Sequence, residues 1–419
     1  MNRREFLRVS GGLAALGSAD LSLAFGAEEV AVGSTLLPWQ PGFLDIHHIN
    51  TGRGNSALMV MPDGTSLLVD AGASGTQGPV MNPARPDDSR RAGQWIARYI
   101  ERHVKATSKA GLDYAILTHL HGDHIGDVTA QSPVSSYGDY KLTGISDVAE
   151  AMPIGKLIDR GYPDYDFPVK ASDPTGMNYI QFVKSAARRG IAVEQIRVGS
   201  PTQVVPLRRR ERYPEFRVRV VAGNGKIWDG VGDAGVPHFP DQSGLRADEA
   251  ASENSCSIAL RINYGRFSYL TGGDLTCDTN YGRDPWRDVE SAAGKAAGPV
   301  SVSTCNHHGY FDATGPEFVR TVRPRVWILQ SWHASHPAMP VLANLYSPIL
   351  YPGQRDVFCL GLHSAAALSC ARFSDRFKSS QGHVLVRVKP GGAEYSVLVL
   401  EDGDESDRVK AEFGPYRSE

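Results

Sequence analysis

The stretch Thr118-His119-Leu120-His121-Gly122-Asp123-His124 holds three imidazoles and one carboxylate. It directly follows the apolar run 112–117, which is typical of a buried strand. Because side chains two apart on extended backbone point the same way, His119 and His121 can reach one metal ion. Asp123 and His124 follow at a turn, where they face elsewhere and can serve a second ion. The alternative is a solvated loop rich in histidine, but ligand-type residues at this spacing after a strand favour metal binding.

The composition is that of an ordinary globular protein. Hydrophobic residues make up 41% and charged residues 21% of the 419 residues, which is enough for one large domain with insertions or two modest domains. The formal net charge of −2 excludes a global attraction to nucleic acid or membrane, although a local basic groove stays open. The five cysteines form an odd number without C-x-x-C spacing, so we expect small buried hydrophobes rather than a disulfide framework.

Residues 1–27 have the features of an export signal. Arg3-Arg4 precedes Phe6-Leu7 and a weakly apolar segment of small residues, and Ala24-Phe25-Gly26 offers a cleavage site. This pattern resembles a Tat signal peptide, which directs folded proteins across the bacterial inner membrane, whereas the alternative is an amphipathic helix. The sequence therefore predicts transport by the Tat export machinery and a periplasmic or secreted protein. No other run reaches the ~18 apolar residues that a membrane span needs.

After a linker at 28–42, apolar runs alternate with turns in the pattern of β-strands. We expect strands at 43–50, 57–61 and 66–69. The third ends at Asp70, and an aspartate in this position is often only a turn residue or a helix cap. Asp70 can also accept a hydrogen bond from a metal-binding histidine and so fix the orientation of that ring.

Region 128–250 is less regular and is expected to contain insertions. A predicted strand at 154–158 ends in a polar and aromatic loop that includes Tyr162. Such loops commonly line binding sites, so Tyr162 is a candidate substrate contact, with a plain surface loop as an equal alternative. The densest basic run, 208–212, is expected to be a solvated strand edge rather than a phosphate or nucleic-acid contact.

Polar residues also follow the expected strands of the second half. The strand 267–270 ends at Asp274 after two glycines, and the strand 300–304 is followed by His307-His308. The strand 326–329 leads into a loop with His333 and His336, which is either a substrate-binding loop or an ordinary one. Strands at 384–388 and 395–400 are expected to close the domain, and residues 401–419 to form an acidic surface tail.

The order of Asp70, the histidine cluster, Asp274 and His307-His308 resembles the metallo-β-lactamase-fold hydrolase superfamily. That resemblance implies an α/β (α+β) fold, a four-layer αββα sandwich with loop insertions over residues 43–400. Within the superfamily the chain is most similar to the ComEC-type branch and to phosphorylcholine esterases. The similar segments are Ile49–Ser56, Asn254-Ser255, Leu270–Asp274 and His307-His308-Gly309.

The resemblance implies a site for two zinc ions. One ion would be held by His119 and His121, and Asp274 would bridge to the other, whose remaining ligands would be Asp123, His124 and His308. His307 is then left for the substrate or leaving group, although the opposite assignment of the histidine pair is open. Many superfamily members carry a further histidine before the bridging aspartate. Here Asn254-Ser255 stands in that interval, where His238 is a weak candidate.

Metal-assisted hydrolysis is the implied reaction. Two zinc ions would give a bridging hydroxide near neutral pH, although these ligand types also leave iron or manganese open. The expected substrate is a small molecule with a phosphodiester-type bond, with Asp123 and His307 as catalytic residues and His333 and His336 beside the phosphoryl oxygens. The alternatives are a β-lactam or lactone hydrolase of the same fold, a redox member that carries iron, and a non-catalytic metal-binding protein.

Overall fold

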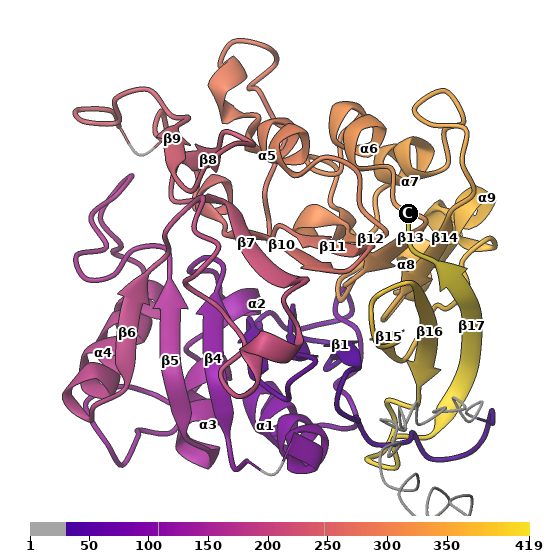
Figure 1. Ribbon diagram of the computed structural model, residues 1–419. Helices are drawn as coiled ribbons and strands as arrows, with labels where there is room; N and C mark the ends of the chain where they lie inside the picture. Colours follow the sequence, from indigo (N-terminus) through magenta and orange to yellow (C-terminus); the bar gives the residue numbers. More distant parts are fainter. Residues whose placement is uncertain (1–30, 108, 247) are drawn as a thin grey trace, which may run out of the picture.

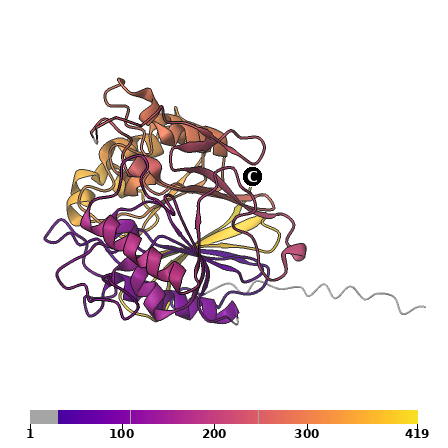
Figure 2. The same cartoon turned by 90° about the vertical axis from the view of Figure 1, so that its left-hand side faces the viewer.

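The structure, a computed structural model, describes residues 31–107, 109–246 and 248–419. The expected export signal at 1–27 therefore lies outside the described residues. The described chain forms two large sheets that pack face to face, with helices on their outer sides (Figures 1 and 2). None of the helices in this part of the chain combines the length and the apolar character that a bilayer crossing needs.

The first sheet has nine strands in the order β17-β16-β15-β1-β2-β3-β4-β5-β6. Their bounds are β1 (Leu44–His48), β2 (Ala57–Val60), β3 (Ser66–Val69), β4 (Leu112–Leu117), β5 (Ile154–Asp159), β6 (Ala192–Gln195), β15 (His383–Val388), β16 (Glu394–Leu400) and β17 (Val409–Arg417). Strands β3 to β6 pair in parallel, so their carboxyl ends meet at one edge. The remaining strands of this sheet pair antiparallel.

The second sheet has eight strands in the order β14-β13-β12-β11-β10-β7-β8-β9. Their bounds are β7 (Phe216–Gly223), β8 (Lys226–Trp228), β9 (Gly235–Pro237), β10 (Ala259–Tyr264), β11 (Phe267–Thr271), β12 (Val302–Thr304), β13 (Val326–Leu329) and β14 (Asp356–Cys359). Strands β11 to β14 pair in parallel. The loops that follow β11 and β12 therefore leave the sheet side by side.

Helices cover the outer face of each sheet (Figure 1). Those beside the first sheet are α1 (Ala92–Val104), α3 (Gly144–Ala151) and α4 (Pro174–Arg188). Those beside the second are α5 (Val289–Ala297), α6 (Pro316–Val322) and α7 (Met339–Leu345), with the short helices α8 (Ser364–Ser369) and α9 (Ala371–Ser374) further along the chain. A single turn, α2 (Gly122–Ile125), follows β4 directly.

Three apolar clusters separate the four layers. Strand β4 shows the division: Tyr114 and Ile116 join the cluster between the sheets, whereas Ala115 and Leu117 join the cluster beneath the helices of the first sheet. This alternation follows from the two-residue period of a strand, and burial on both faces explains its continuous apolar sequence. A third cluster lies between the second sheet and its helices. The predicted αββα sandwich is confirmed.

The C-terminal segment differs from the expected acidic surface tail. Residues 409–417 form β17, which pairs antiparallel with β16 at the edge of the first sheet. Val409 is buried, and Ala411 and Phe413 pack against the core between the sheets. Their two-residue spacing is the pattern of a strand with one buried face, which the acidic residues before it obscured. The linker is also tied down, since Leu36 packs in the same cluster as Val409.

One further expectation needs correction. The basic run is not a strand edge, because Arg210–Arg212 forms a 3-10 helix. Within that run, Arg208 makes an ion pair of 3.0 Å with the buried carboxylate of Asp113.

Candidate metal centre

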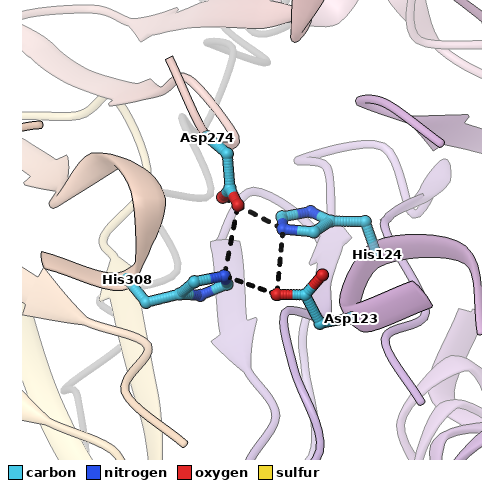
Figure 3. A group of neighbouring side chains, drawn as sticks. All are labelled: Asp123, His124, Asp274 and His308. Atoms are coloured by element: carbon cyan, nitrogen blue, oxygen red, sulfur yellow. Dashed lines mark hydrogen bonds and ion pairs between the residues drawn. The ribbon is translucent and has the colours of Figure 1, made fainter. Parts of the chain in front are cut away.

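Four ligand-type side chains converge where loops from the two sheets meet. They are Asp123, His124, Asp274 and His308, and one ligand atom from each lies within 4.8 Å of the others. Figure 3 shows all four pointing to a common centre. Asp123 and His124 lie on α2 after β4, Asp274 follows β11, and His308 follows β12. Each sheet therefore contributes two of the four.

Hydrogen bonds on its outer side fix the ring of His124. Its Nδ1 donates to Oδ2 of Asp70 over 2.7 Å, which leaves Nε2 facing Oδ1 of Asp274 at 3.0 Å. Asp70 also accepts hydrogen bonds from the backbone and hydroxyl of Thr118, at 2.7 and 2.8 Å. This network selects one tautomer of His124 and presents the other nitrogen to the centre.

Asn55 orients the ring of His308 in the same way. Nδ1 of His308 lies 3.0 Å from Oδ1 of Asn55, while Nε2 lies 2.8 Å from Oδ2 of Asp123 and 3.3 Å from Oδ2 of Asp274. The backbone N–H of Asn55 donates to the carbonyl of Asp123. Sequence reasoning missed this role, although Asn55 lies in the turn that carried the family resemblance.

His119 and His121 form a second group beside the first. Nε2 of His119 lies 3.1 Å from Nδ1 of His121 and 3.8 Å from Oδ2 of Asp274. The ring of His119 is fully buried, whereas His121 is exposed. Asp274 therefore lies between the pair and the four-residue centre, which is the arrangement needed for a bridging carboxylate.

His307 approaches the centre from a different side than His308. Its Nε2 lies 3.8 Å from Oδ2 of Asp274, and its Nδ1 donates to Oδ1 of Asp312 over 2.7 Å. The amide of Asn254 lies 3.3 Å from Nε2. Both histidines have positive φ, 46° for His307 and 56° for His308, a strained conformation typical of functional loops. The role of Asp312 was not foreseen.

The other candidate residues lie at different distances from the centre. The ring of His336 stacks on that of His308 with centroids 5.0 Å apart, and the ring of His333 lies 5.5 Å beyond His336. Tyr162 instead packs against the apolar cluster beneath the helices of the first sheet. His238 lies beside Phe239, with ring centroids 6.1 Å apart, and is not part of the four-residue group.

Opposite charges dominate the electrostatics of the centre. Burial lowers the pKa of His124 and His308, but the negative charges of Asp274 and the other carboxylates have the larger, opposite effect. The net result is that both pKa values rise, that of His308 to about 9. Burial raises the pKa of Asp274, but His124 and His308 outweigh it, so the net shift is well below the usual value. The pKa of His119 falls well below its usual value because of burial and the neighbouring His124. A neutral His119 is ready to act as a ligand.

These shifts predict how the metal-free protein responds to pH. Because the pKa of His308 is higher in the folded protein than in the unfolded chain, where it is ~6.5, protonation of His308 stabilises the fold. This stabilisation is complete below pH ~6.5 and is lost as pH rises through about 9. We therefore expect the difference in unfolding free energy between the chelator-treated wild type and His308→Gln to shrink from pH 6 to pH 10. Urea unfolding at several pH values measures it. A difference that grows with pH would contradict the shift.

The residues present fit a bound metal ion. Nε2 of His124 and Oδ1 of Asp274 are buried and lie 3.0 Å apart, and neither makes a hydrogen bond of regular geometry among the described residues. Buried polar atoms are normally satisfied, and an ion held between these two would satisfy both. Imidazole and carboxylate ligands suit zinc, and they also bind iron and manganese.

Comparison with protein families agrees with this geometry. Residues 49–130 match the family model described as the metallo-beta-lactamase superfamily. The matched segment includes Asn55, Asp70 and the whole histidine cluster. A search of curated proteins found no match.

Three solved structures align with most of this chain at low sequence identity and low TM-score. CmlA, a diiron β-hydroxylase from Streptomyces venezuelae, has 11% identity and a TM-score of 0.36, and the alignment covers 84% of this chain and 55% of CmlA. YhfI from Bacillus subtilis has 12% identity and a TM-score of 0.33, with 83% of this chain and 99% of YhfI covered. Zn²⁺-bound PqqB from Methylobacterium extorquens has 9% identity and a TM-score of 0.37, with coverages of 82% and 99%.

The chain thus spans about half the length of CmlA. The resemblance to the superfamily inferred from the sequence is supported by the family match, while the ComEC-type branch stays a prediction. The match over residues 49–130, the αββα sandwich and the cluster of ligand-type side chains together make the chain similar to the metallo-beta-lactamase superfamily in its fold and in its candidate metal centre.

Proposed function

We propose that the protein is an exported, dinuclear metal-dependent hydrolase that acts on a phosphodiester-type bond. The observation that carries the proposal is the convergence of four ligand-type side chains, two of which present buried atoms that face each other without a regular hydrogen bond among the described residues. Export by the Tat machinery rests on residues 1–27 of the sequence alone. Fractionation of producing cells tests it, because protein confined to the cytoplasm would contradict export.

Each ion has its own set of ligands in this proposal. Asp123, His124 and His308 would hold one ion and His119 and His121 the other, with Asp274 shared. Zinc is the preferred metal, with iron and manganese as alternatives. When bound, two such ions supply Lewis-acid chemistry, which lowers the pKa of water and polarises the scissile group. The pair His119 and His121 would bring fewer protein ligands to its ion than the other group would.

The chain's own groups around the ions suit an oxyanion substrate. His307 is held by Asp312 so that its Nε2 points to the centre, where the amide of Asn254 lies 3.3 Å away. The buried ring of His336 stacks on that of His308, and its Nδ1 has no hydrogen-bond partner among the described residues. Such donors can bind the phosphoryl oxygens and orient the leaving group, which favours a phosphodiester over an apolar substrate.

Substrate screening with metal-loaded protein tests the function. Hydrolysis of bis-p-nitrophenyl phosphate, with little turnover of p-nitrophenyl phosphate, lactones and nitrocefin, supports the proposal. Preferential turnover of a lactone or nitrocefin would instead identify a carbonyl hydrolase of the same fold. Metal analysis of the purified protein identifies the resident ion. If none of these esters is hydrolysed by protein with full metal content, the protein is a metal-binding protein without this activity.

Replacing His307 separates substrate binding from metal binding. We expect His307→Ala to lower kcat by about 10²-fold, the usual loss for a group that assists proton transfer, while the zinc content stays unchanged. His363→Ala is the matched control, because Nε2 of His363 faces the carbonyl of Pro79 and the residue is not a candidate ligand or substrate contact. Steady-state kinetics and metal analysis measure both effects. Loss of an ion in His307→Ala would show that His307, and not His308, is the ligand.

A further inference from the structure

One backbone amide in the histidine cluster is held by a side chain from a distant part of the chain. The N–H of Leu120, which lies between the ligand candidates His119 and His121, donates to Oε1 of Glu253 over 2.8 Å. Fixing this peptide group restricts the backbone rotations on either side of it. The relative orientation of the two imidazoles therefore depends on where Glu253 is held.

Arg160 holds Glu253 in place. It follows β5 and is only 1% exposed, and its Nε donates to Oε1 of Glu253 over 2.6 Å while Nη2 donates to Oε2. The remaining nitrogen, Nη1, donates to the carbonyl of Phe167 at 2.7 Å and to Oδ1 of Asn224 at 3.2 Å. A buried guanidinium needs hydrogen-bond partners for its nitrogens, so Arg160 is itself held in place by Phe167 and Asn224. Arg160 in turn fixes both carboxylate oxygens of Glu253.

The residues after Glu253 attach to the same strand end. Ser257 Oγ lies 3.2 Å from Nδ1 of His119, and the backbone N–H of Ile258 donates to the carbonyl of Thr118. Asn254, on a 3-10 helix over 254–256, contacts His307. One short segment thus contacts both histidine groups of the site. It contains Asn254-Ser255, which stand in the interval where the sequence departs from the family pattern.

We propose that Glu253, fixed by Arg160, is a positioning residue that sets the spacing of His119 and His121 and thereby the affinity of the ion they hold. The inference rests on the proposed function, because it requires an ion at this pair. It also gives part of region 128–250 a role, since β5 and the loops after it deliver Arg160 and its partners. Groups that orient metal ligands in this way typically change metal affinity by about 10–100-fold when they are lost.

A pair of double variants isolates the hydrogen bond to Leu120. Arg160→Met/Glu253→Gln and Arg160→Met/Glu253→Leu both remove the ion pair and leave no buried charge unpaired, but only the Gln variant keeps an acceptor for the Leu120 amide. Zinc titration of the metal-free proteins measures the affinity of each ion. We expect the Leu variant to bind one of its two ions about 10–100-fold more weakly than the wild type does. The affinity of the Gln variant should lie between the two, because it keeps the acceptor for the Leu120 amide but loses the support of Arg160.

Asp45→Asn is the control for the loss of a buried ion pair, because Asp45 pairs with Arg387 away from the histidine cluster. We expect it to lower the melting temperature without changing zinc affinity. Should the Leu variant fail to fold, Glu253→Asp takes its place, since the shorter side chain keeps the charge beside Arg160 but withdraws the acceptor from Leu120. Equal zinc affinity in the Gln and Leu variants, whether unchanged or weakened, would overturn the inference. Failure of the wild type to bind two ions would instead overturn the proposed function.

Discussion

Replacement of Asp274 by alanine is expected to abolish binding of both ions and, with it, hydrolysis. Oxygens of this carboxylate lie 3.0 Å from Nε2 of His124, 3.3 Å from that of His308 and 3.8 Å from that of His119. Because this carboxylate reaches both ligand groups, its loss would remove a ligand from each proposed ion and leave buried imidazoles without a counter-charge. Turnover should fall by about 10³-fold or more.

Metal analysis and hydrolysis of the best substrate test this expectation together. Asp402→Ala is the matched control, because Asp402 is also a fully buried carboxylate but hydrogen-bonds to Asn50 rather than to the histidine cluster. It should lose stability and keep its zinc. An Asp274→Ala protein with the zinc content of the wild type would show that Asp274 does not bridge the ions.

Gly72→Ala is expected to damage both the fold and the metal centre. A Cβ at Gly72 would lie 2.0 Å from the carbonyl oxygen of Asp123 and 2.7 Å from the backbone nitrogen of Asn55. Neither atom can move alone, since the N–H of Asn55 donates to that same carbonyl and Asn55 orients His308. The clash should cost about 3 kcal/mol or more of unfolding free energy and displace Asp123.

Denaturant unfolding and zinc titration of the variant measure these two effects. Gly353→Ala is a suitable control, because its φ is not in the left-handed region and a Cβ there would meet only the ring of Tyr351, at 3.5 Å. It should change stability little and leave zinc binding intact. If Gly72→Ala matched this control in both measurements, the close approach of Gly72 to Asp123 would not constrain the site.

The fold was largely predictable because its strands are short, strongly apolar and separated by turns. The run 112–117 matches β4 residue for residue, and its burial on both faces explains why the signal is so clear. The histidine cluster was equally easy to predict from the sequence, because its ligand-type residues are close together and follow a strand. Segment 409–417 shows the limit: its alternation was present, but the acidic residues before it suggested a solvated tail.

The supporting residues could not be predicted because their partners are remote in sequence. Asn55 contacts a histidine 253 positions away, and Glu253 contacts an amide 133 positions away. In the sequence both look like ordinary polar loop residues, because their contacts form only when the two sheets pack together. Tyr162 was predicted as a substrate contact from its place after a strand; its partly buried ring packs against the apolar cluster beneath the helices, and the contact stays a prediction.

The contribution of each sheet to the four-residue centre has a consequence for the order of assembly. Asp123 and His308 are 185 positions apart, so the first half of the chain leaves the ribosome with its histidine cluster but without half of the ligands. Closing so long a loop costs entropy that only the packed second sheet can offset. Full coordination of an ion is therefore a late event in folding, and metal uptake reports that both halves of the molecule are in place.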